Sequence, residues 1–169
     1  TLHLLAVESC IRLRPTVDGK ALFTVEYVKP AAGTLHPIQR ALIDTHASQC
    51  GYCTPGIVMS LTASYERHLD ANTRPTRQQL GDDLAGNLCR CTGYKPILDA
   101  GERMFDAPAV RLETSAALKA LNALSNDDFE YHAASAADAS RETAFHAPRS
   151  IAALAALLLA KPDARLIAG

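Results

Sequence analysis

Four of the five cysteines stand in two short motifs whose spacing suits a metal centre. Cys50 and Cys53 form a C-x2-C pair, and Cys89 and Cys91 form a C-x-C pair. Four thiolates supply the negative charge and soft donation that an iron–sulfur cluster requires, and the same number satisfies a structural zinc ion. A single residue between two cysteines is unusual for zinc, but spacing by itself leaves a 2Fe–2S cluster and a zinc ion both open.

Other roles for the cysteines fit the sequence less well. The odd total of five, with Cys10 standing alone, argues against a disulfide framework and favours a reducing, cytoplasmic compartment. A redox-active dithiol at Cys50 and Cys53 would need a βαβ pattern around it, and the flanking sequence has none. Loops rich in glycine and polar residues are poor places to bury inert thiols, whereas Cys10 by itself is most simply a small buried hydrophobe.

Four helices are expected between residues 34 and 106, and the two motifs join them in pairs. The first runs over 37–46 with a proline in its first turn, and the second begins with Thr54 as its N-cap and ends near His68. A capping box of Thr76 and Gln79 starts the third, and Thr92 caps the fourth. The positions expected to face the interior are Leu35, Ile38, Leu42, Ile57, Leu61, Tyr65, Leu80, Leu84, Leu88, Ile97, Gly101, Met104 and Phe105.

The two motifs resemble each other in their surroundings. Each ends a helix, presents two cysteines in a short loop, and starts the next helix with a threonine and a nearby proline. The predicted fold is therefore mainly α, a four-helix bundle whose two helix–loop–helix halves are related by a pseudo-two-fold axis. Such an arrangement brings both cysteine loops to the same end of the bundle.

The flanking segments predict different structure. Residues 1–28 are expected to be β-rich, with strands in the alternating run 21–28 after an Asp-Gly turn. Residues 107–144 are expected to be a linker with one short helix at 115–124. A second domain then begins over 145–169, with a core helix at 151–160 and a buried strand at 165–169 that enters a glycine turn.

Composition excludes several classes of function. Seventeen basic and eighteen acidic residues give a net charge of −1, which offers no positive field for nucleic acid or an anionic membrane. The most apolar run, 151–160, is too short to span a bilayer, and no secretory signal pattern is present. No nucleophile–base pair or phosphate-binding glycine loop is evident, so no catalytic residue is expected, and His36 and His46 are expected to cap or pack.

The residues around the motifs resemble a known family. Residues 35–39, 48–60 and 86–98 closely resemble the second iron–sulfur domain of the xanthine oxidase family of molybdenum hydroxylases. The resemblance covers about 34–105 and implies a 2Fe–2S cluster rather than zinc. Its implied ligands are Cys50, Cys53, Cys89 and Cys91.

The same resemblance implies roles for residues outside the four-cysteine site. Residues 1–28 would be the end of a plant-type ferredoxin domain, and Cys10 would be the fourth ligand of a first 2Fe–2S cluster whose other ligands precede Thr1. Gln49 and Cys91 would approach a molybdenum–molybdopterin cofactor on a separate large subunit. Residues 145–169 would start an FAD-binding domain, and its implied flavin contacts are Leu166, Ile167, Ala168 and Gly169.

Domain order refines what the resemblance implies about activity. An iron–sulfur bundle, a linker and a flavin domain on one chain are similar to the small subunit of a hetero-oligomeric, NAD-dependent xanthine dehydrogenase. In such an enzyme the molybdenum subunit oxidises hypoxanthine and xanthine, and this chain passes the electrons through 2Fe–2S clusters to FAD and NAD. The alternatives are an oxidoreductase for aldehydes or other aromatic heterocycles, and a zinc-stabilised structural or interaction module.

Overall fold

The computed structural model describes residues 2–29, 33–125, 127–135, 138 and 140–167. The chain divides into two compact units. One contains Leu22–Leu118 together with the chain up to Ile11, and the other contains Arg12–Ala21 together with the chain from Lys119 onward. Among the described residues, no helix is long and apolar enough to cross a membrane.

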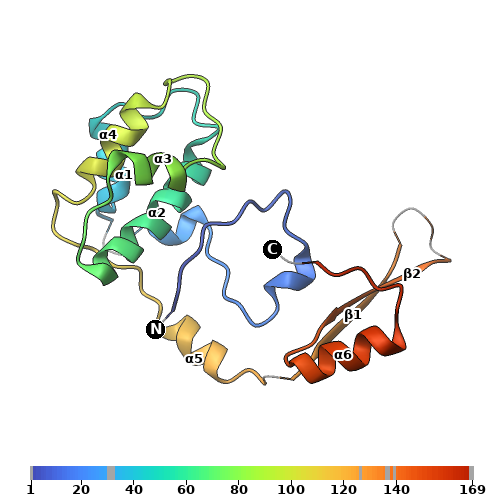
Figure 1. Cartoon of the computed structure of the whole chain (residues 1–169). Helices are drawn as coiled ribbons and strands as arrows, with labels where there is room; N and C mark the ends of the chain where they lie inside the picture. The colour runs from blue at the N-terminus through green and yellow to red at the C-terminus, as the bar shows by residue number, and fades with distance from the viewer. Residues whose placement is uncertain (1, 30–32, 126, 136–137, 139, 168–169) are drawn as a thin grey trace. The chain divides into compact units, whose positions relative to one another are not determined.

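The first unit is a group of four helices, drawn in cyan to yellow in Figure 1. They are α1 (Pro37–Asp44), α2 (Thr54–Ala71), α3 (Arg77–Asp83) and α4 (Lys95–Arg103). α1 packs against α2 and α4, and α3 packs against the same two helices. The structure is therefore mostly helical, as the sequence predicts, and each cysteine motif lies in a connection between two consecutive helices.

Capping explains where these helices begin. His36 is the N-cap of α1: its ring accepts from the Ile38 N–H, and the Gln39 side chain accepts from the His36 N–H. Thr76 and Gln79 form the predicted capping box on α3. Two predicted starts are wrong, because the N-cap of α2 is Cys53 rather than Thr54, and α4 begins after Tyr94 rather than after Thr92.

The end of α2 also differs from the prediction. The helix continues three residues beyond His68 to Ala71 and stops where Asn72 adopts a left-handed conformation, with φ of 50°. The His68 ring remains inside the last turn and bonds to the Thr73 hydroxyl at 2.7 Å. Asparagine tolerates this conformation because its short polar side chain can hydrogen-bond locally.

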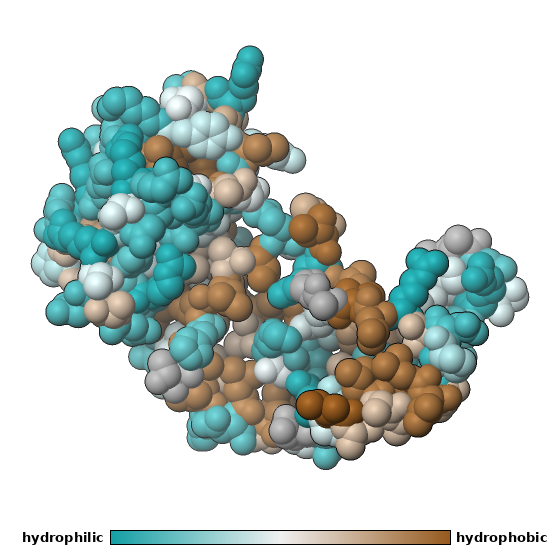
Figure 2. Space-filling view, in the orientation of Figure 1, coloured by the Kyte–Doolittle hydropathy of each residue, from teal (hydrophilic) through white to brown (hydrophobic). Residues whose placement is uncertain are grey.

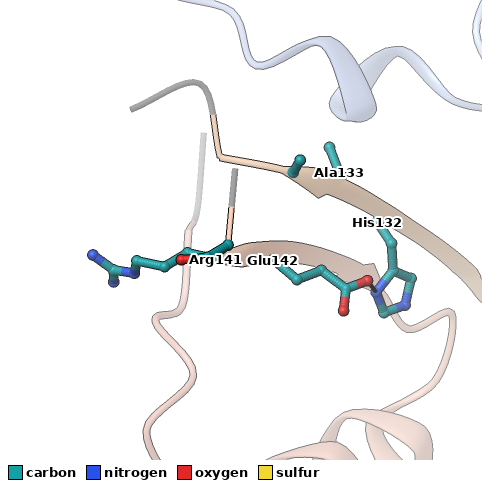
Figure 3. Close-up of a pocket in the computed structure, with 6 residues that line it drawn as sticks. His132, Ala133, Arg141 and Glu142 are labelled. Atoms are coloured by element: carbon teal, nitrogen blue, oxygen red, sulfur yellow. Dashed lines mark ion pairs between the residues drawn. The ribbon is translucent and has the colours of Figure 1, made fainter. Parts of the chain in front are cut away.

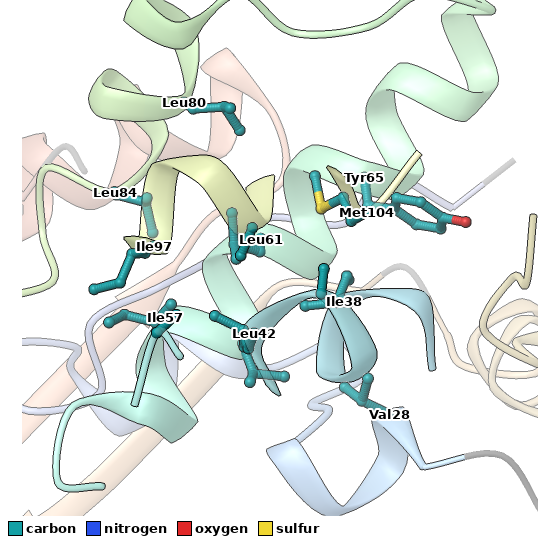
Figure 4. Packing of buried hydrophobic residues seen from close by; sticks show 14 of the residues in the cluster. Val28, Ile38, Leu42, Ile57, Leu61, Tyr65, Leu80, Leu84, Ile97 and Met104 are labelled. Carbon is teal, nitrogen blue, oxygen red and sulfur yellow. The ribbon is translucent and has the colours of Figure 1, made fainter. Parts of the chain in front are cut away.

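The interior of the bundle is filled by apolar side chains from all four helices (Figure 4). Leu61, Tyr65, Leu80, Ile97 and Met104 are fully buried there. Most of the predicted inward positions are confirmed, with Phe105 partly buried, but the predictions for Leu35 and Leu88 are wrong, because these side chains are 37% and 84% exposed. α3 ends at Asp83, so the helical spacing on which the Leu88 prediction depends does not extend that far.

The predicted strands in residues 21–28 are wrong. The structure has short 3₁₀ helices at Arg14–Val17 and Val25–Val28, and none of the described residues before Pro37 forms a strand. Val28 is buried and Val25 is partly buried against the bundle core. A strand requires a paired neighbour, and packing of these valines on the helices takes the place of that pairing here.

The second unit contains a hairpin that the sequence analysis did not expect. β1 (Phe129–Ala134) pairs antiparallel with β2 (Glu142–Ala147), from Phe129 opposite Ala147 to Ala134 opposite Glu142. β1 lies within the range predicted to be a linker. The short helix predicted in the same range is confirmed as α5 (Ser115–Asn122).

α6 (Ile151–Ala160) forms as predicted, and the Ser150 hydroxyl caps it by accepting from the Ala153 N–H at 3.0 Å. It is not a core helix, however: Ile151 is 88% exposed and none of its residues is buried. Figure 2 shows hydrophobic side chains gathered over α6. The helix is apolar around most of its circumference, so only a half-buried stripe that includes Leu154 and Leu157 is covered by the described chain.

Candidate metal centre

The two cysteine loops meet at one end of the bundle, as the sequence predicts. Cys50 lies in the loop between α1 and α2, and Cys91 lies in the loop between α3 and α4. Their Sγ atoms are 3.4 Å apart although 41 residues separate them in the chain. The tertiary packing of the four helices, rather than local sequence, therefore creates this contact.

The other two cysteines form a second contact deeper in the structure. The thiols of Cys53 and Cys89 lie near enough for each to shift the pKa of the other. Cys89 is buried and Cys53 is half-buried, whereas Cys50 and Cys91 are exposed. We refer to Cys50 and Cys91 as the outer pair and to Cys53 and Cys89 as the inner pair; each pair takes one cysteine from each loop.

Ionisation is unequal within each pair. Hydrogen bonds from the Thr92 hydroxyl and then from the Thr92 backbone N–H lower the pKa of Cys89 to about 7. Burial, followed by the hydrogen bond to Cys89, raises the pKa of Cys53 to about 11. In the metal-free chain, the inner pair therefore favours a thiolate on Cys89 beside a thiol on Cys53.

The outer pair has the same inequality. The backbone N–H of Tyr52, and next the contact with Cys91, lower the pKa of Cys50. The contact with Cys50 raises the pKa of Cys91. In each pair one cysteine therefore has a lowered pKa and the other a raised pKa, and metal binding would displace the thiol protons because metals bind thiolates.

The second loop holds Cys89 by both its backbone and its sulfur. The Cys89 N–H donates to the Tyr94 hydroxyl at 2.8 Å, and the Thr92 hydroxyl lies 3.3 Å from the Cys89 Sγ. Gly93 and Tyr94 have φ of 67° and 68°, a left-handed turn that brings the tyrosine back toward Cys89. From the sequence, Thr92 is expected only to cap a helix, and no role is expected for Tyr94. Gly93 between them is the one sequence sign of a tight turn.

The first loop is built differently. Gly51 has φ of 83°, and its carbonyl accepts from the Thr54 N–H at 3.2 Å, so the chain turns sharply between Cys50 and Cys53. The Thr54 hydroxyl bonds to the Ser48 hydroxyl at 2.7 Å. Both ends of the loop are therefore tied together without using either sulfur.

The donor set fits a group with two metal ions. Two thiolates on one tetrahedral metal, with metal–sulfur bonds of about 2.3 Å, lie roughly 3.8 Å apart, close to the 3.4 Å of the outer pair. Within the described ranges, no set of three or more histidine, cysteine, aspartate or glutamate side chains surrounds one metal-ion position. Two thiolate pairs side by side match the ligands of a 2Fe–2S cluster, in which each iron takes two cysteines.

Among the described residues, no recorded hydrogen bond joins the side chain of Gln49 or Cys10 to the outer or inner pair. Gln49 is exposed beside Cys50, and Cys10 is an exposed free thiol. Leu166 and Ile167 are 70% and 60% exposed and form neither the predicted strand nor a buried contact. Ala168 and Gly169 lie outside the described residues.

A shallow hollow of about 310 Å³ lies on the hairpin of the second unit (Figure 3). His132 and Glu142 line it, and the Nδ1 of His132 is 2.7 Å from a Glu142 oxygen. The Nε2 of the same ring is 2.7 Å from a Glu130 oxygen. Both carboxylates raise the pKa of His132, and the hydrogen bond to Glu130 has the larger effect. His132 and Glu142 in this hollow therefore pair with one another.

Comparison with known proteins agrees with the cysteine geometry. Residues 24–102 match the family described as "[2Fe-2S] binding domain". The chain is 49% identical over 96 residues to aldehyde oxidase 1 of Cavia porcellus and 47% identical over 95 residues to xanthine dehydrogenase of Oryza sativa subsp. japonica. Each match covers 56% of this chain and 7% of the relative, so the chain spans a small part of these proteins.

A solved structure is similar as well. Quinoline 2-oxidoreductase from Pseudomonas putida 86 aligns with a TM-score of 0.50 and 32% sequence identity. The alignment covers 57% of this chain and 56% of that one.

Proposed function

We propose that the outer and inner pairs bind one 2Fe–2S cluster, because residues 24–102 match the [2Fe-2S] binding domain family and the chain is similar to a xanthine dehydrogenase and an aldehyde oxidase. The observation that carries this proposal is the pairing of sulfurs between the two loops. Cys50 and Cys91 would hold one iron, and Cys53 and Cys89 would hold the other. The protein supplies geometry and electrostatics, and the cluster supplies one-electron chemistry.

The proposed ligand pairing explains the resemblance between the two halves of the bundle. Each half would contribute one thiolate to each iron, which agrees with the similar arrangement of the two helix–loop–helix units. The packing of the four helices around one core fixes the positions of the two cysteine loops relative to each other. Loss of either half would leave both irons with one protein ligand each.

The exposure of the outer pair indicates the side from which a redox partner would approach the cluster. Cys50 and Cys91 are exposed, and Gln49 is exposed next to them, so this edge is where a redox partner comes nearest to the cluster. We assign Gln49 and Cys91 to the approach of a molybdopterin on a molybdenum-binding subunit. A side-chain amide suits that role because it both donates to and accepts from a pterin edge.

We propose that the complete protein is the electron-transfer subunit of a molybdenum hydroxylase of the xanthine dehydrogenase type. Electrons from a purine would pass through this cluster to FAD and then NAD. Cys10 would complete a further 2Fe–2S site, and the residues around Leu166 and Ile167 would approach the flavin. The names of the relatives also include aldehyde oxidase and quinoline 2-oxidoreductase, so aldehydes and aromatic heterocycles are the competing substrate classes.

Spectroscopy of the anaerobically prepared protein tests the cluster. We expect visible charge-transfer absorption, at least two irons and two sulfides per chain, and an EPR signal of a one-electron-reduced cluster after dithionite. A colourless, EPR-silent sample with stoichiometric zinc would instead establish a structural module and overturn the proposal.

A further inference from the structure

The two threonines that follow the cysteine motifs occupy equivalent positions but have different partners. Thr54 follows Cys53, and its hydroxyl pairs with the Ser48 hydroxyl at 2.7 Å. Thr92 follows Cys91, and its hydroxyl lies 3.3 Å from the Cys89 Sγ. The two halves of the bundle therefore differ in the hydrogen bond of this threonine, and only the Thr92 hydroxyl contacts a proposed ligand, Cys89.

The direction of this bond follows from the chemistry of the bound state. A cysteine that binds a metal is a thiolate without a proton, so only the Thr92 hydroxyl can donate. The backbone N–H groups of Thr92 and Cys91 also bond to the Cys89 sulfur. Cys89 is buried, so water competes little for this acceptor, and hydrogen bonds at such a site are strong.

The backbone on both sides of Thr92 is fixed, which keeps its hydroxyl in place. The Cys89 N–H donates to the Tyr94 hydroxyl, and the left-handed turn at Gly93 and Tyr94 closes the loop. The Lys95 N–H then returns to the Gly93 carbonyl at 2.9 Å as α4 begins. Thr92 therefore sits in a loop that is hydrogen-bonded at both ends.

We propose that Thr92 is a positioning residue that raises the reduction potential of the cluster through its hydrogen bond to Cys89. This inference rests on the proposed function. Reduction converts two ferric ions to one ferric and one ferrous ion by uptake of one electron, and no covalent bond forms or breaks. The added negative charge is shared by the thiolates, so a donor at sulfur stabilises the reduced form more than the oxidised form.

A redox titration with dithionite, monitored by EPR and absorption on the iron-loaded protein, tests this role. Thr92→Val removes the hydroxyl and keeps the β-branched shape, and Thr92→Ser keeps the hydroxyl. We expect Thr92→Val to lower the equilibrium constant for reduction about tenfold, which is about 59 mV for a one-electron couple. Thr92→Ser is expected to restore the wild-type midpoint.

Thr54→Val is the matched control because it removes the equivalent hydroxyl, which touches no sulfur. Its midpoint should equal that of the wild type. Thr92→Ala is a second test variant if Thr92→Val loads iron poorly, and the same fall is expected. A wild-type midpoint in an iron-loaded Thr92→Val or Thr92→Ala protein, or an equal fall in Thr54→Val, would overturn the inference.

The wild-type EPR and absorption spectra distinguish failure of the proposed cluster from failure of the proposed role of Thr92. If the wild-type protein gives no 2Fe–2S signal, the proposed function fails and Thr92 has no cluster to tune. If the wild-type signal is normal and the midpoint does not respond to Thr92, only the role of Thr92 fails.

Discussion

Glu66 on α2 accepts a hydrogen bond from the backbone N–H of Leu112 at 2.8 Å, 46 residues further along the chain. Its carboxylate is buried and also forms an ion pair with Arg111, with 3.1 Å between the Arg111 guanidinium nitrogen and the Glu66 Oε2. One residue earlier, the Val110 carbonyl contacts the His36 ring at 2.9 Å. The segment that follows α4 is therefore fastened to α1 and α2 by groups from the first half of the bundle.

The attachment of residues 110–112 to α2 should depend more on the hydrogen bond that Glu66 accepts from the Leu112 N–H than on the negative charge of Glu66. Glu66→Ala leaves the Leu112 N–H without its partner and should lower the free energy of unfolding by about 2 kcal/mol. Glu66→Gln keeps an acceptor oxygen and should lose about half as much. Urea unfolding followed by circular dichroism measures both, and equal losses in the two variants would contradict this assignment.

Asp70 provides the surface comparison for Glu66. It also pairs with Arg111, at 2.6 Å, but its side chain is 53% exposed. Exposed ion pairs contribute little, so Asp70→Asn should change the free energy of unfolding by less than about 1 kcal/mol. A larger loss in Asp70→Asn than in Glu66→Gln would assign the fastening to surface charge.

His36 should make stability depend on pH in the weakly acidic range. Burial lowers the pKa of His36 below its ordinary value of 6.5, and the Val110 carbonyl opposes that shift. Because the unfolded chain binds the proton more readily, the contribution to stability is present above about pH 6.5 and is lost as the pH falls through the folded-state pKa. The free energy of unfolding should therefore decrease between about pH 7 and about pH 5.

His36→Asn isolates this contribution because asparagine is also a good N-cap. The variant should be less stable than the wild type at neutral pH, since it loses the bond to Val110, but its stability should fall less on acidification. Burial also lowers the pKa of His68, which remains in both proteins and contributes equally to both curves. Parallel curves for the two proteins would refute the role of His36.

Removing one cysteine from either pair should abolish the cluster. Cys89→Ser takes a ligand from the inner pair and Cys91→Ser takes one from the outer pair, so each leaves an iron with a single thiolate. We expect loss of bound iron and of the EPR signal in both, whereas Cys10→Ser leaves the signal of this site unchanged. Retention of a normal 2Fe–2S spectrum in Cys89→Ser would refute the ligand assignment.

Two glycines on neighbouring helices should respond in opposite directions to alanine. A Cβ on Gly101 would lie 2.9 Å from a buried Leu80 methyl, whereas a Cβ on Gly81 meets nothing within 4 Å. Gly101→Ala should cost about 1 kcal/mol of stability by overpacking, and Gly81→Ala should add about 0.5 kcal/mol by stiffening the unfolded chain. Thermal unfolding compares the two variants. Stabilisation by both would show that the Leu80 side chain can shift to make room for the added methyl group, which would contradict the predicted overpacking.

Much of the bundle was predictable because its signals are local. The capping box of Thr76 and Gln79 and the helical spacing of Ile97 and Met104 are read within one or two turns, and both are confirmed. The alternation in residues 21–28 also suggested strands, but tertiary packing of Val28 on the helices overrides it. β1 was missed because the polar composition of its surroundings predicts a linker.

The meeting of the two cysteine loops was predictable from the sequence, but the hydrogen bonds around the cysteines were not. Two cysteine motifs between four helices suffice to predict that the loops meet. The cysteine spacing does not show that the Thr54 hydroxyl pairs with Ser48 whereas the Thr92 hydroxyl pairs with Cys89, because both threonines directly follow a cysteine. That difference depends on the left-handed turn at Gly93 and Tyr94.

The unequal exposure of the two pairs also has a chemical consequence for handling the protein. Cys50 and Cys91 face solvent, whereas Cys89 is covered by protein. If the cysteines hold the proposed cluster, molecular oxygen, peroxide and iron chelators would reach it through the outer pair first, on the same side that a redox partner would cover. Docking of such a partner would thus shield the cluster from oxidative decay as well as connect it.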